Sequence, residues 1–420
     1  AYARDNFSTF IELPLRNAAA QNAVRREIEE LRVQQVPMLL FLDRVRSLKF
    51  RILGVDGETE TEFLFIRSDE TKEIGNIALS RVSLGDAGNL LVARRAVAER
   101  VMKEAIAEAI SQKELNEHWK RWTGAGDVAI AVRLDAPVET SRLYTYLPMG
   151  EQAEAPFQGY LHGSFFPSSN RKHLNARNRL NAVLLEEATG LVSEAVYQIV
   201  MDPAGMVSDW LTDDERSAAV ADFMCWEKVG SLETDENLAE VVAFKVAEVF
   251  GCEAFDDAPI VPCAESGALG PVLTWKPPKF SRLWPDCDST FSAKEAAHFA
   301  AALGVWPIWN SMASRQDRLD NYLSSYSEGY AGEPDGKERA RLVESVAKRL
   351  HKNSRTAKAS WQEFFLQIPD FMGRDGSLLA GLSVLVGDDG QLHAAMSPAP
   401  EAERSSRPSR RRRNLETAIF

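Results

Sequence analysis

Apolar residues follow two different periodicities in the first half of the chain. Between Asn17 and Gln35 they recur every three or four positions among Arg and Glu, which predicts an amphipathic helix. Further on, short apolar runs bounded by turn residues predict strands, and these runs are VPMLLFLDRVRSLKFRIL, TEFLFIRS, NIALSRVSL, DVAIAVRLD, RLYTYLP and GYLHGSF. The first two runs flank Asp56-Gly57, a turn sequence that favours an antiparallel hairpin.

Two longer segments are rich in helix-forming residues. LLVARRAVAERVMKEAIAEAI, from Leu90 to Ile110, contains strong helix formers throughout and predicts one long helix. A second helix is predicted from Leu180, where apolar residues again recur at helical spacing. The strands and helices together predict an α+β domain over residues 17–205, with an antiparallel or mixed sheet covered by helices.

The second half of the chain has a different pattern. Residues 206–355 predict a mainly helical domain, interrupted by an extended piece at PVLTWKPPKF because the Pro277-Pro278 pair cannot continue a helix. Residues 356–420 predict a small α/β segment, in which Asp389-Gly390 forms the turn of a terminal hairpin. This segment includes a polar, basic linker from Ala399 to Arg413, whose composition is typical of a loop.

The overall charge narrows the set of partners. The 420 residues include 61 Asp and Glu against 49 Lys and Arg, which gives a net charge of −12. This excess argues against a protein that coats nucleic acid or an anionic membrane with its whole surface. The Arg410–Arg413 run could touch nucleic acid or another acidic partner, but it lacks neighbouring aromatic residues for base stacking. A solvated linker is therefore the favoured interpretation of that run.

Cysteine spacing and hydropathy favour a cytoplasmic protein. The four cysteines fall at irregular spacings without a C-x-x-C pair, which is typical of reduced thiols. No stretch approaches 18 consecutive apolar residues, so the sequence predicts no membrane span.

The sequence lacks the common nucleotide-binding and hydrolase motifs. It has no G-x-x-x-x-G-K-[ST], G-x-G-x-x-G, H-E-x-x-H or G-x-S-x-G pattern. Four histidines stand apart from other potential ligands, and Cys252 and Cys263 lack a matching pair of histidines, so no metal site is predicted. These histidines are His118, His298, His351 and His393. The WPIW run, Trp306 to Trp309, could line a client groove together with Trp284, but packing in the core is the favoured interpretation.

A turn after the GYLHGSFFP run carries the candidate chemistry. Ser169, Asn170, Arg171 and Lys172 follow a predicted strand and precede the helix predicted from Leu180. Backbone N–H groups near a helix start favour an anion, and arginine offers a rigid fork of donors to phosphate oxygens. The turn is therefore a candidate phosphate-binding element, with Arg171 as its main cation. A solvated basic loop that only caps the helix is the alternative.

The string YTYLP...GYLHGSFFPSSNRKHLN...NRLNAVLLEEA resembles a segment of sacsin and its bacterial relatives. In that family a strand ending in LP is followed by a His-containing strand and a turn similar to SNRR. FIELPLR, from Phe10 to Arg16, resembles the last strand of the GHKL-type ATP-binding module of these proteins, and PMLLFLDRVRSLKF resembles the opening of the domain behind it. The resemblance covers residues 8–200, and SWQEFFLQIPDF...LVGDDGQLHAA is a weaker echo of later segments.

This resemblance implies a transducer domain, the module that follows the nucleotide pocket in GHKL ATPases. A basic residue of that domain reaches the terminal phosphate of ATP. Carried onto this sequence, the resemblance implies that Arg171 takes that catalytic place, with Lys172 as the second choice and Asn170 and Ser169 as further nucleotide contacts. A cation at this position assists phosphoryl transfer and also reports whether the terminal phosphate is present. The resemblance further implies a homodimer and a chaperone-like or bacterial defence role, in which ATP hydrolysis drives conformational change.

The chain itself does not carry a complete nucleotide pocket. It has no acidic residue with a partner Asn on a predicted helix and no D-x-G-x-G pattern. ATP and Mg²⁺ are therefore expected to be held mostly by an upstream ATP-binding module of the same polypeptide. The sequence begins without an initiator Met, and we interpret residues 1–16 as the last strand of that truncated module. The alternative is a non-catalytic scaffold or interaction region of a large multidomain protein.

Overall fold

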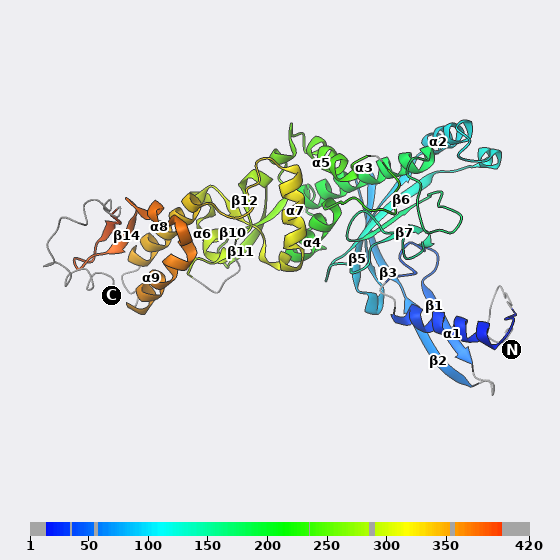
Figure 1. The fold of residues 1–420 in the computed structure, drawn as a ribbon, viewed down its shortest axis with the longest axis horizontal. Coiled ribbons are helices and arrows are strands. Elements are labelled where there is room, and N and C mark those ends of the chain that lie inside the picture. Colours follow the sequence, from blue (N-terminus) through cyan, green and yellow to red (C-terminus); the bar gives the residue numbers. More distant parts are fainter. Residues whose placement is uncertain are drawn as a thin grey trace. The chain divides into compact units, whose positions relative to one another are not determined.

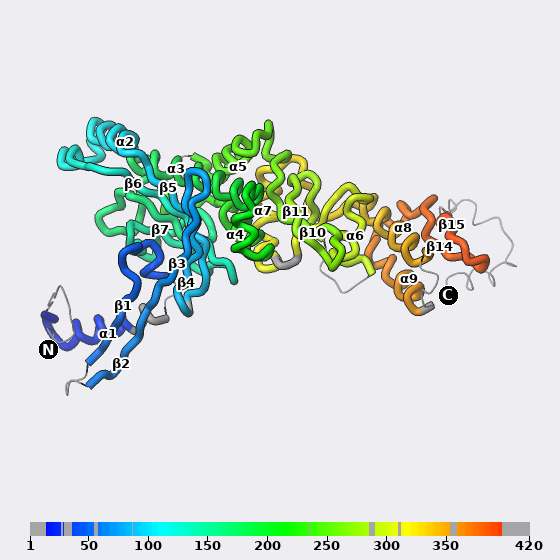
Figure 2. Tube along the Cα trace, turned by 180° about the vertical axis from the view of Figure 1, so that it is seen from behind, coloured from blue at the N-terminus to red at the C-terminus, as the bar shows by residue number. Residues whose placement is uncertain are grey.

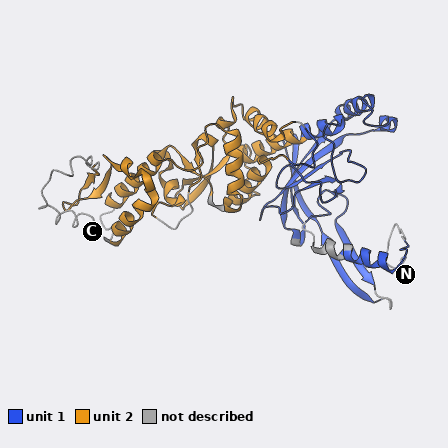
Figure 3. Cartoon of the chain, in the orientation of Figure 1, with its two compact units in different colours: residues 1–187, 229–235 blue, residues 188–228, 236–420 orange. Residues whose placement is uncertain are grey.

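The computed structural model describes residues 14–33, 36–53, 58–234, 236–284, 290–352 and 358–396. The chain divides into two compact units, residues 1–187 with 229–235 and residues 188–228 with 236–420 (Figure 3). The domain boundaries expected near residues 205 and 355 both fall within the second unit. Most of the strand expected over residues 1–16, the Asp56-Gly57 turn and the Arg410–Arg413 run lie outside the described residues.

The first unit is built on a seven-stranded mixed sheet (Figure 1). Its strand order is β3-β4-β5-β6-β9-β7-β8, and neighbouring strands are antiparallel except for β7 and β9, which are parallel. The strands are β3 (Ser68–Ile74), β4 (Ile77–Ser83), β5 (Asn89–Val97), β6 (Gly126–Arg133), β7 (Arg142–Thr145), β8 (Leu147–Pro148) and β9 (Tyr160–Gly163).

A separate antiparallel hairpin precedes this sheet along the chain. It consists of β1 (Ser47–Leu53) and β2 (Thr59–Ile66), whose pairing confirms the predicted hairpin (Figure 2). The helix predicted between Asn17 and Gln35 is also present, as α1 (Ala18–Val33).

A hydrophobic cluster and two helices pack against the central strands of the sheet. Side chains alternate along a strand, and Leu90 and Val92 of β5 pack in one cluster with Leu39, Leu40 and Phe41 from the segment before β1. Helix α2 (Glu99–Ser111) lies against β6, where the Met102 side chain approaches Gly126, and the first part of α3 (Arg179–Met201) contacts β5. An ion pair of 3.7 Å from β5 to α3 marks that second contact. The central strands β5 and β6 are therefore mostly buried.

The long helix predicted from Leu90 to Ile110 is wrong in its first half. Asn89–Val97 is strand β5, and the helix begins only at Glu99. Leu, Ala and Arg are good helix formers, but β5 lies between β4 and β6 and forms ladders with both. Burial on both faces and pairing on both edges outweigh the local helix preference.

The sequence pattern also missed strand β3, Ser68–Ile74. This strand is SDETKEI, which has no alternation of apolar and polar residues. It lies at the edge of the sheet and pairs with β4 only. Charged side chains are common on edge strands because they discourage pairing with other chains.

The second unit is mainly helical, as predicted. Its helices after α3 are α4 (Asp213–Met224), α5 (Leu238–Val249), α6 (Ala293–Leu303), α7 (Gln316–Tyr326), α8 (Gly336–Lys352) and α9 (Lys358–Met372). Three two-stranded sheets accompany them, formed by β10 (Val261–Ser266) with β11 (Pro271–Lys276), β12 (Ser281–Arg282) with β13 (Trp306–Pro307), and β14 (Ser383–Val386) with β15 (Leu392–Ala394). The β14–β15 hairpin around Asp389-Gly390 confirms the predicted terminal hairpin, and β11 confirms the extended piece before the Pro277-Pro278 pair.

Short 3-10 helices connect several of these elements. They are η2 (Gly85–Ala87), η3 (Glu117–Arg121), η4 (Phe255–Asp257), η5 (Pro278–Phe280), η6 (Asn310–Arg315) and η7 (Gly373–Leu379). None of the helices in the described part of the chain has the length and apolar character needed to span a membrane.

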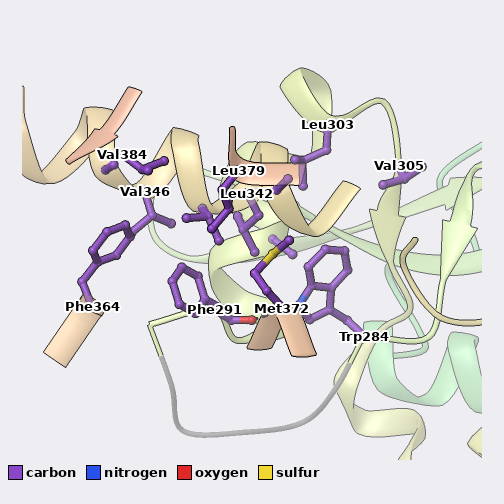
Figure 4. Close-up of a cluster of buried hydrophobic side chains, with 14 of the residues drawn as sticks. Trp284, Phe291, Leu303, Val305, Leu342, Val346, Phe364, Met372, Leu379 and Val384 are labelled. Atoms are coloured by element: carbon purple, nitrogen blue, oxygen red, sulfur yellow. Dashed lines mark hydrogen bonds between the residues drawn. The ribbon is translucent and has the colours of Figure 1, made fainter. Parts of the chain in front are cut away.

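A hydrophobic cluster from α6, α8, α9 and β14 forms a core of the second unit (Figure 4). Trp284 lies in this cluster with Phe291 and Met372, and its indole N–H donates to the carbonyl of Phe291 at 3.0 Å. This placement confirms core packing for Trp284. Trp306 and Trp309 are half-buried, and neither belongs to this cluster.

Candidate functional site

The candidate turn lies between β9 and α3, in the first unit, and its backbone is fixed by local hydrogen bonds. The Arg171 N–H donates to the Ser168 carbonyl at 2.8 Å. The Asn170 side-chain oxygen accepts from the Ser168 hydroxyl at 2.8 Å and from the Lys172 N–H at 3.0 Å. The same hydroxyl oxygen accepts from the His173 N–H at 3.2 Å. Asn170 thus shapes the turn, whereas Ser169 is exposed on it.

Arg171 occupies the left-handed region of backbone space, with φ of 56°. This conformation is uncommon for a residue with a Cβ and persists where the surroundings enforce it. A contact from outside the turn provides this support, because the Arg171 carbonyl accepts from the Gly150 N–H at 2.9 Å. The Gly150 carbonyl in turn accepts from the guanidinium of buried Arg142 at 2.7 Å. The turn is therefore anchored to the segment that follows β8.

The Arg171 guanidinium is exposed and contacts only neutral oxygens of the described chain. Its Nη2 donates to the Thr145 hydroxyl at 2.5 Å and lies 3.4 Å from the Leu147 carbonyl. Within the described ranges no carboxylate forms an ion pair with Arg171, and the same holds for exposed Lys172. The Arg171 guanidinium is thus held in place beside the exposed Lys172, and within the described ranges neither charge is offset by a carboxylate, which favours an incoming anion.

The start of α3 does not contribute to an anion site, and this part of the prediction is wrong. The helix begins at Arg179, well beyond the turn. The side chain of Asn178 accepts from the N–H groups of Leu180 and Asn181 at 3.1 and 3.4 Å. The Arg179 N–H donates to Glu114 at 2.9 Å. These first N–H groups already have partners in the protein, so the helix start does not bind an anion beside the turn.

The same contacts correct the alternative interpretation, in which the turn caps the helix. Asn178 is the capping residue, because its side-chain oxygen receives the two N–H groups at the helix start. Ser168 accepts a hydrogen bond from the His173 N–H of its own loop, so its hydroxyl does not cap the helix. The basic turn and the cap of α3 are thus separate structures.

A cavity of about 390 Å³ lies beside the turn. It is lined by Glu114, Phe166, Pro167, Ser168, His173, Asn175, Asn178 and Glu233. Two carboxylates among these residues make this side unfavourable for a phosphate. Arg171 and Lys172 do not line this cavity, so the cationic surface and the cavity are distinct.

A hydrogen-bonded group that sequence analysis missed lies next to the site. Tyr146 lies between β7 and β8, and its N–H donates to Nδ1 of buried His162 at 3.2 Å. The other ring nitrogen, Nε2, lies 3.2 Å from Asp127, which also accepts from the Ser164 hydroxyl at 3.0 Å. This is not a nucleophilic triad, since the serine bonds to the aspartate and not to the histidine. No short motif could identify the group, because pairing of β6 with β9 brings its members together.

The electrostatics of this group favour a charged aspartate. Burial alone would raise the pKa of Asp127, but hydrogen bonds from His162 and from the hydroxyl of Ser164 hold that pKa below its ordinary value. The carboxylate therefore remains a hydrogen-bond acceptor at neutral pH.

Other candidate chemistry does not come together in the described part of the chain. No group of three or more His, Cys, Asp or Glu side chains in those ranges could hold a metal ion. Cys225, Cys252 and Cys263 are free thiols, and burial raises the pKa of Cys225 and Cys263 to about 12. These two buried thiols are thus protonated at neutral pH and are poor nucleophiles.

No protein-family model, curated protein or solved structure matches this chain. The resemblance to sacsin-like proteins therefore rests on the residues quoted for it.

Proposed function

We propose that this chain is the transducer region of a sacsin-like GHKL ATPase. In this proposal Arg171 reaches the terminal phosphate of ATP that an upstream module of the same polypeptide binds. Lys172 adds a second positive charge beside it, and Asn170 holds the turn in shape. The protein then couples hydrolysis to a conformational change, in a chaperone-like or bacterial defence role in the cytoplasm.

One observation carries this proposal: the exposed guanidinium of Arg171 has no ion-pair partner in the described ranges, although its position is fixed. Hydrogen bonds to Thr145 and Leu147 orient the guanidinium, and a hydrogen bond from Gly150 fixes its backbone. A side chain that only improved solubility would need no such support. A guanidinium that meets a phosphate gains from it, because little reorganisation is left at the moment of binding.

The residues present fit a phosphate better than a whole nucleotide. Arg171 and Lys172 match the charge of phosphate oxygens, and the guanidinium fork matches their geometry. Mg²⁺ would neutralise charge on the phosphates when ATP is bound, and we assign its ligands to the upstream module. Homodimerisation, which is common among GHKL proteins, is part of the same proposal.

The experiment is a comparison of ATP turnover in the longer polypeptide that contains the upstream module. Arg171→Ala should lower kcat roughly 100-fold or more, the range seen when one donor to a developing negative charge is removed. Arg171→Lys should recover part of that loss, because it keeps the charge without the fork. Lys172→Ala should have a smaller effect.

Arg100→Ala is the matched control. Arg100 belongs to the same unit and its side chain is 78% exposed, and among the described residues it pairs only with Glu104 on its own helix. Its removal should leave turnover unchanged. Unchanged turnover in Arg171→Ala would remove Arg171 from the mechanism and favour the scaffold interpretation of this chain.

A further inference from the structure

The turn between β7 and β8 holds a residue in a conformation that needs outside support. Tyr146 has φ of 67°, in the left-handed region that is unfavourable for a side chain with a Cβ. Its neighbours Thr145 and Leu147 supply the two oxygens that lie against the Arg171 guanidinium. The conformation of Tyr146 therefore determines where those oxygens lie.

His162 provides this support from within the core. Its side chain is fully buried, and its ring stacks on Phe41 with the ring centroids 5.0 Å apart. The Tyr146 ring contacts the same imidazole in a tilted arrangement with the ring centroids 4.9 Å apart, and the Tyr146 N–H donates to Nδ1 at 3.2 Å. A ring nitrogen that accepts a hydrogen bond cannot carry a proton, so Nδ1 must be unprotonated.

Asp127 determines which ring nitrogen carries the proton. Its Oδ2 lies 3.2 Å from His162 Nε2. The Ser164 hydroxyl accepts from the Asp127 N–H at 3.3 Å and donates to Oδ1 at 3.0 Å. A carboxylate can only accept, so Nε2 carries the ring proton and Nδ1 remains free for Tyr146.

We infer that His162, kept in its Nε2-protonated form by Asp127, is a positioning residue for Arg171. Through the Tyr146 N–H it fixes the turn whose oxygens orient the guanidinium. The importance of that orientation rests on the proposed function, whereas the chain of hydrogen bonds can be tested without nucleotide.

Two measurements on the 420-residue protein test these hydrogen bonds, one at the Tyr146 amide and one at the Arg171 guanidinium. The first is hydrogen exchange of the Tyr146 amide in protein labelled with ¹⁵N-tyrosine, which contains only eight tyrosines. The second is the rate at which phenylglyoxal modifies the Arg171 guanidinium, followed by mass spectrometry. The rate at Arg100, in the same samples, serves as an internal control.

Asp127→Asn is the decisive variant, because it keeps the shape of the side chain. The Ser164 hydroxyl still needs an acceptor at Oδ1, so the new NH₂ group must face His162 Nε2. The ring proton then moves to Nδ1 and opposes the Tyr146 N–H. Both rates, at Tyr146 and at Arg171, should rise roughly fivefold, the factor for losing one hydrogen bond of average strength.

A second substitution should reverse this effect. In Asp127→Asn with Ser164→Ala the carboxamide is free to rotate and present its oxygen to Nε2. The proton returns to Nε2, and both rates should fall back toward those of the wild type. If Asp127 had only a structural role, the double variant would lose two contacts and the single variant one. Both rates should then be higher in the double variant than in the single variant.

His162→Gln and His162→Asn provide an independent pair. Gln places its polar atoms near the Nε2 position and leaves Tyr146 without an acceptor, so both rates should rise. Asn places an oxygen near the Nδ1 position, so both rates should stay close to wild type. Thermal melting of each variant verifies that it is folded before the rates are compared.

Three results would overturn the inference. They are wild-type rates in Asp127→Asn, failure of Ser164→Ala to restore them, and faster exchange at Tyr146 without faster modification of Arg171. None of these readouts involves ATP. If the proposed function is wrong, these rate changes are still expected. If the hydrogen-bond chain from Asp127 to Arg171 is wrong, the effect of Arg171→Ala on ATP turnover is still expected.

Discussion

Two buried arginines of the second unit and Arg171 of the first unit lie in opposite environments. In the second unit Arg315 of η6 is 5% exposed and pairs with Asp222 of α4, which is 2% exposed, at 2.9 Å. Arg282 of β12 forms a bidentate pair with Glu338 of α8, at 2.9 and 3.0 Å. In the first unit Arg171 is exposed and contacts neutral oxygens. A carboxylate offsets the desolvation of these two buried guanidinium groups, whereas the exposed Arg171 needs no such partner.

This difference separates structural arginines from those that are available to a ligand. A phosphate cannot reach a guanidinium that a buried carboxylate already occupies without first breaking that pair. Breaking the Arg282–Glu338 pair would also disturb the start of α8. There the Glu338 carboxylate accepts from the Asp335 N–H, and the Asp335 carboxylate accepts from the Glu338 N–H. The Arg171 guanidinium is held at Nη2 by Thr145 and Leu147. An anion can therefore bind this guanidinium without breaking an ion pair among the described residues.

The largest expected effect comes from breaking a buried pair. Asp222→Ala should lower the free energy of unfolding by about 3–5 kcal/mol, because it leaves the charge of Arg315 buried without its carboxylate. Urea denaturation at pH 7.5 measures this change, and the pH lies above the pKa of Asp222, which burial raises to about 6 despite Arg315. Replacing both partners, Asp222→Leu with Arg315→Met, should recover most of the loss. A loss below about 1 kcal/mol in the single variant would contradict the comparison.

The two aspartates should also give pH dependences of opposite sign. The raised pKa of Asp222 means that the proton-linked part of its contribution to stability is present below its ordinary pKa of 3.8 and is lost as the pH rises through about 6, while the ion pair with Arg315 remains above that pH. The lowered pKa of Asp127 means that its contribution is present above 3.8 and is lost as the pH falls through the folded-state value. Unfolding free energies of the wild type minus each Asn variant, measured across this range, should therefore change in opposite directions. Changes in the same direction would show that the pKa values of the two carboxyl groups are shifted in the same direction, which would contradict this prediction.

The smallest expected effect is that of Arg171→Ala on stability. The side chain is exposed, so the free energy of unfolding of the chain should change by no more than about 0.5 kcal/mol. The measurement is the same urea titration, with Arg100→Ala beside it. A loss as large as that of Asp222→Ala would place Arg171 among the structural arginines and weaken the proposed function.

Much of the fold follows from periodicity, and the exceptions have specific causes. The helix α1, the β1–β2 hairpin and the terminal hairpin each have a local pattern or turn sequence that determines them. β5 does not, because its residues favour a helix and only the neighbouring strands make it a strand. β3 does not either, since an edge strand needs no apolar face.

The candidate site divides in the same way. The basic turn is visible in the sequence because Arg171 and Lys172 are consecutive residues after a strand. The contacts that hold the turn are invisible there, because Thr145, Leu147 and Gly150 reach it from another hairpin. Residue types can be predicted from a motif, but hydrogen-bond partners that are distant along the chain depend on strand order.

The path of the chain through α3 has a consequence for how the protein is synthesised. Helix α3 begins in the first unit and continues into the second, and the chain then returns to the first unit over residues 229–235. That return is secured where the Ser231 hydroxyl donates to the Glu154 carbonyl at 2.7 Å and Leu232 bridges to Leu174. The first unit therefore cannot be completed on the ribosome until part of the second has emerged. A single protease cut cannot release either unit whole.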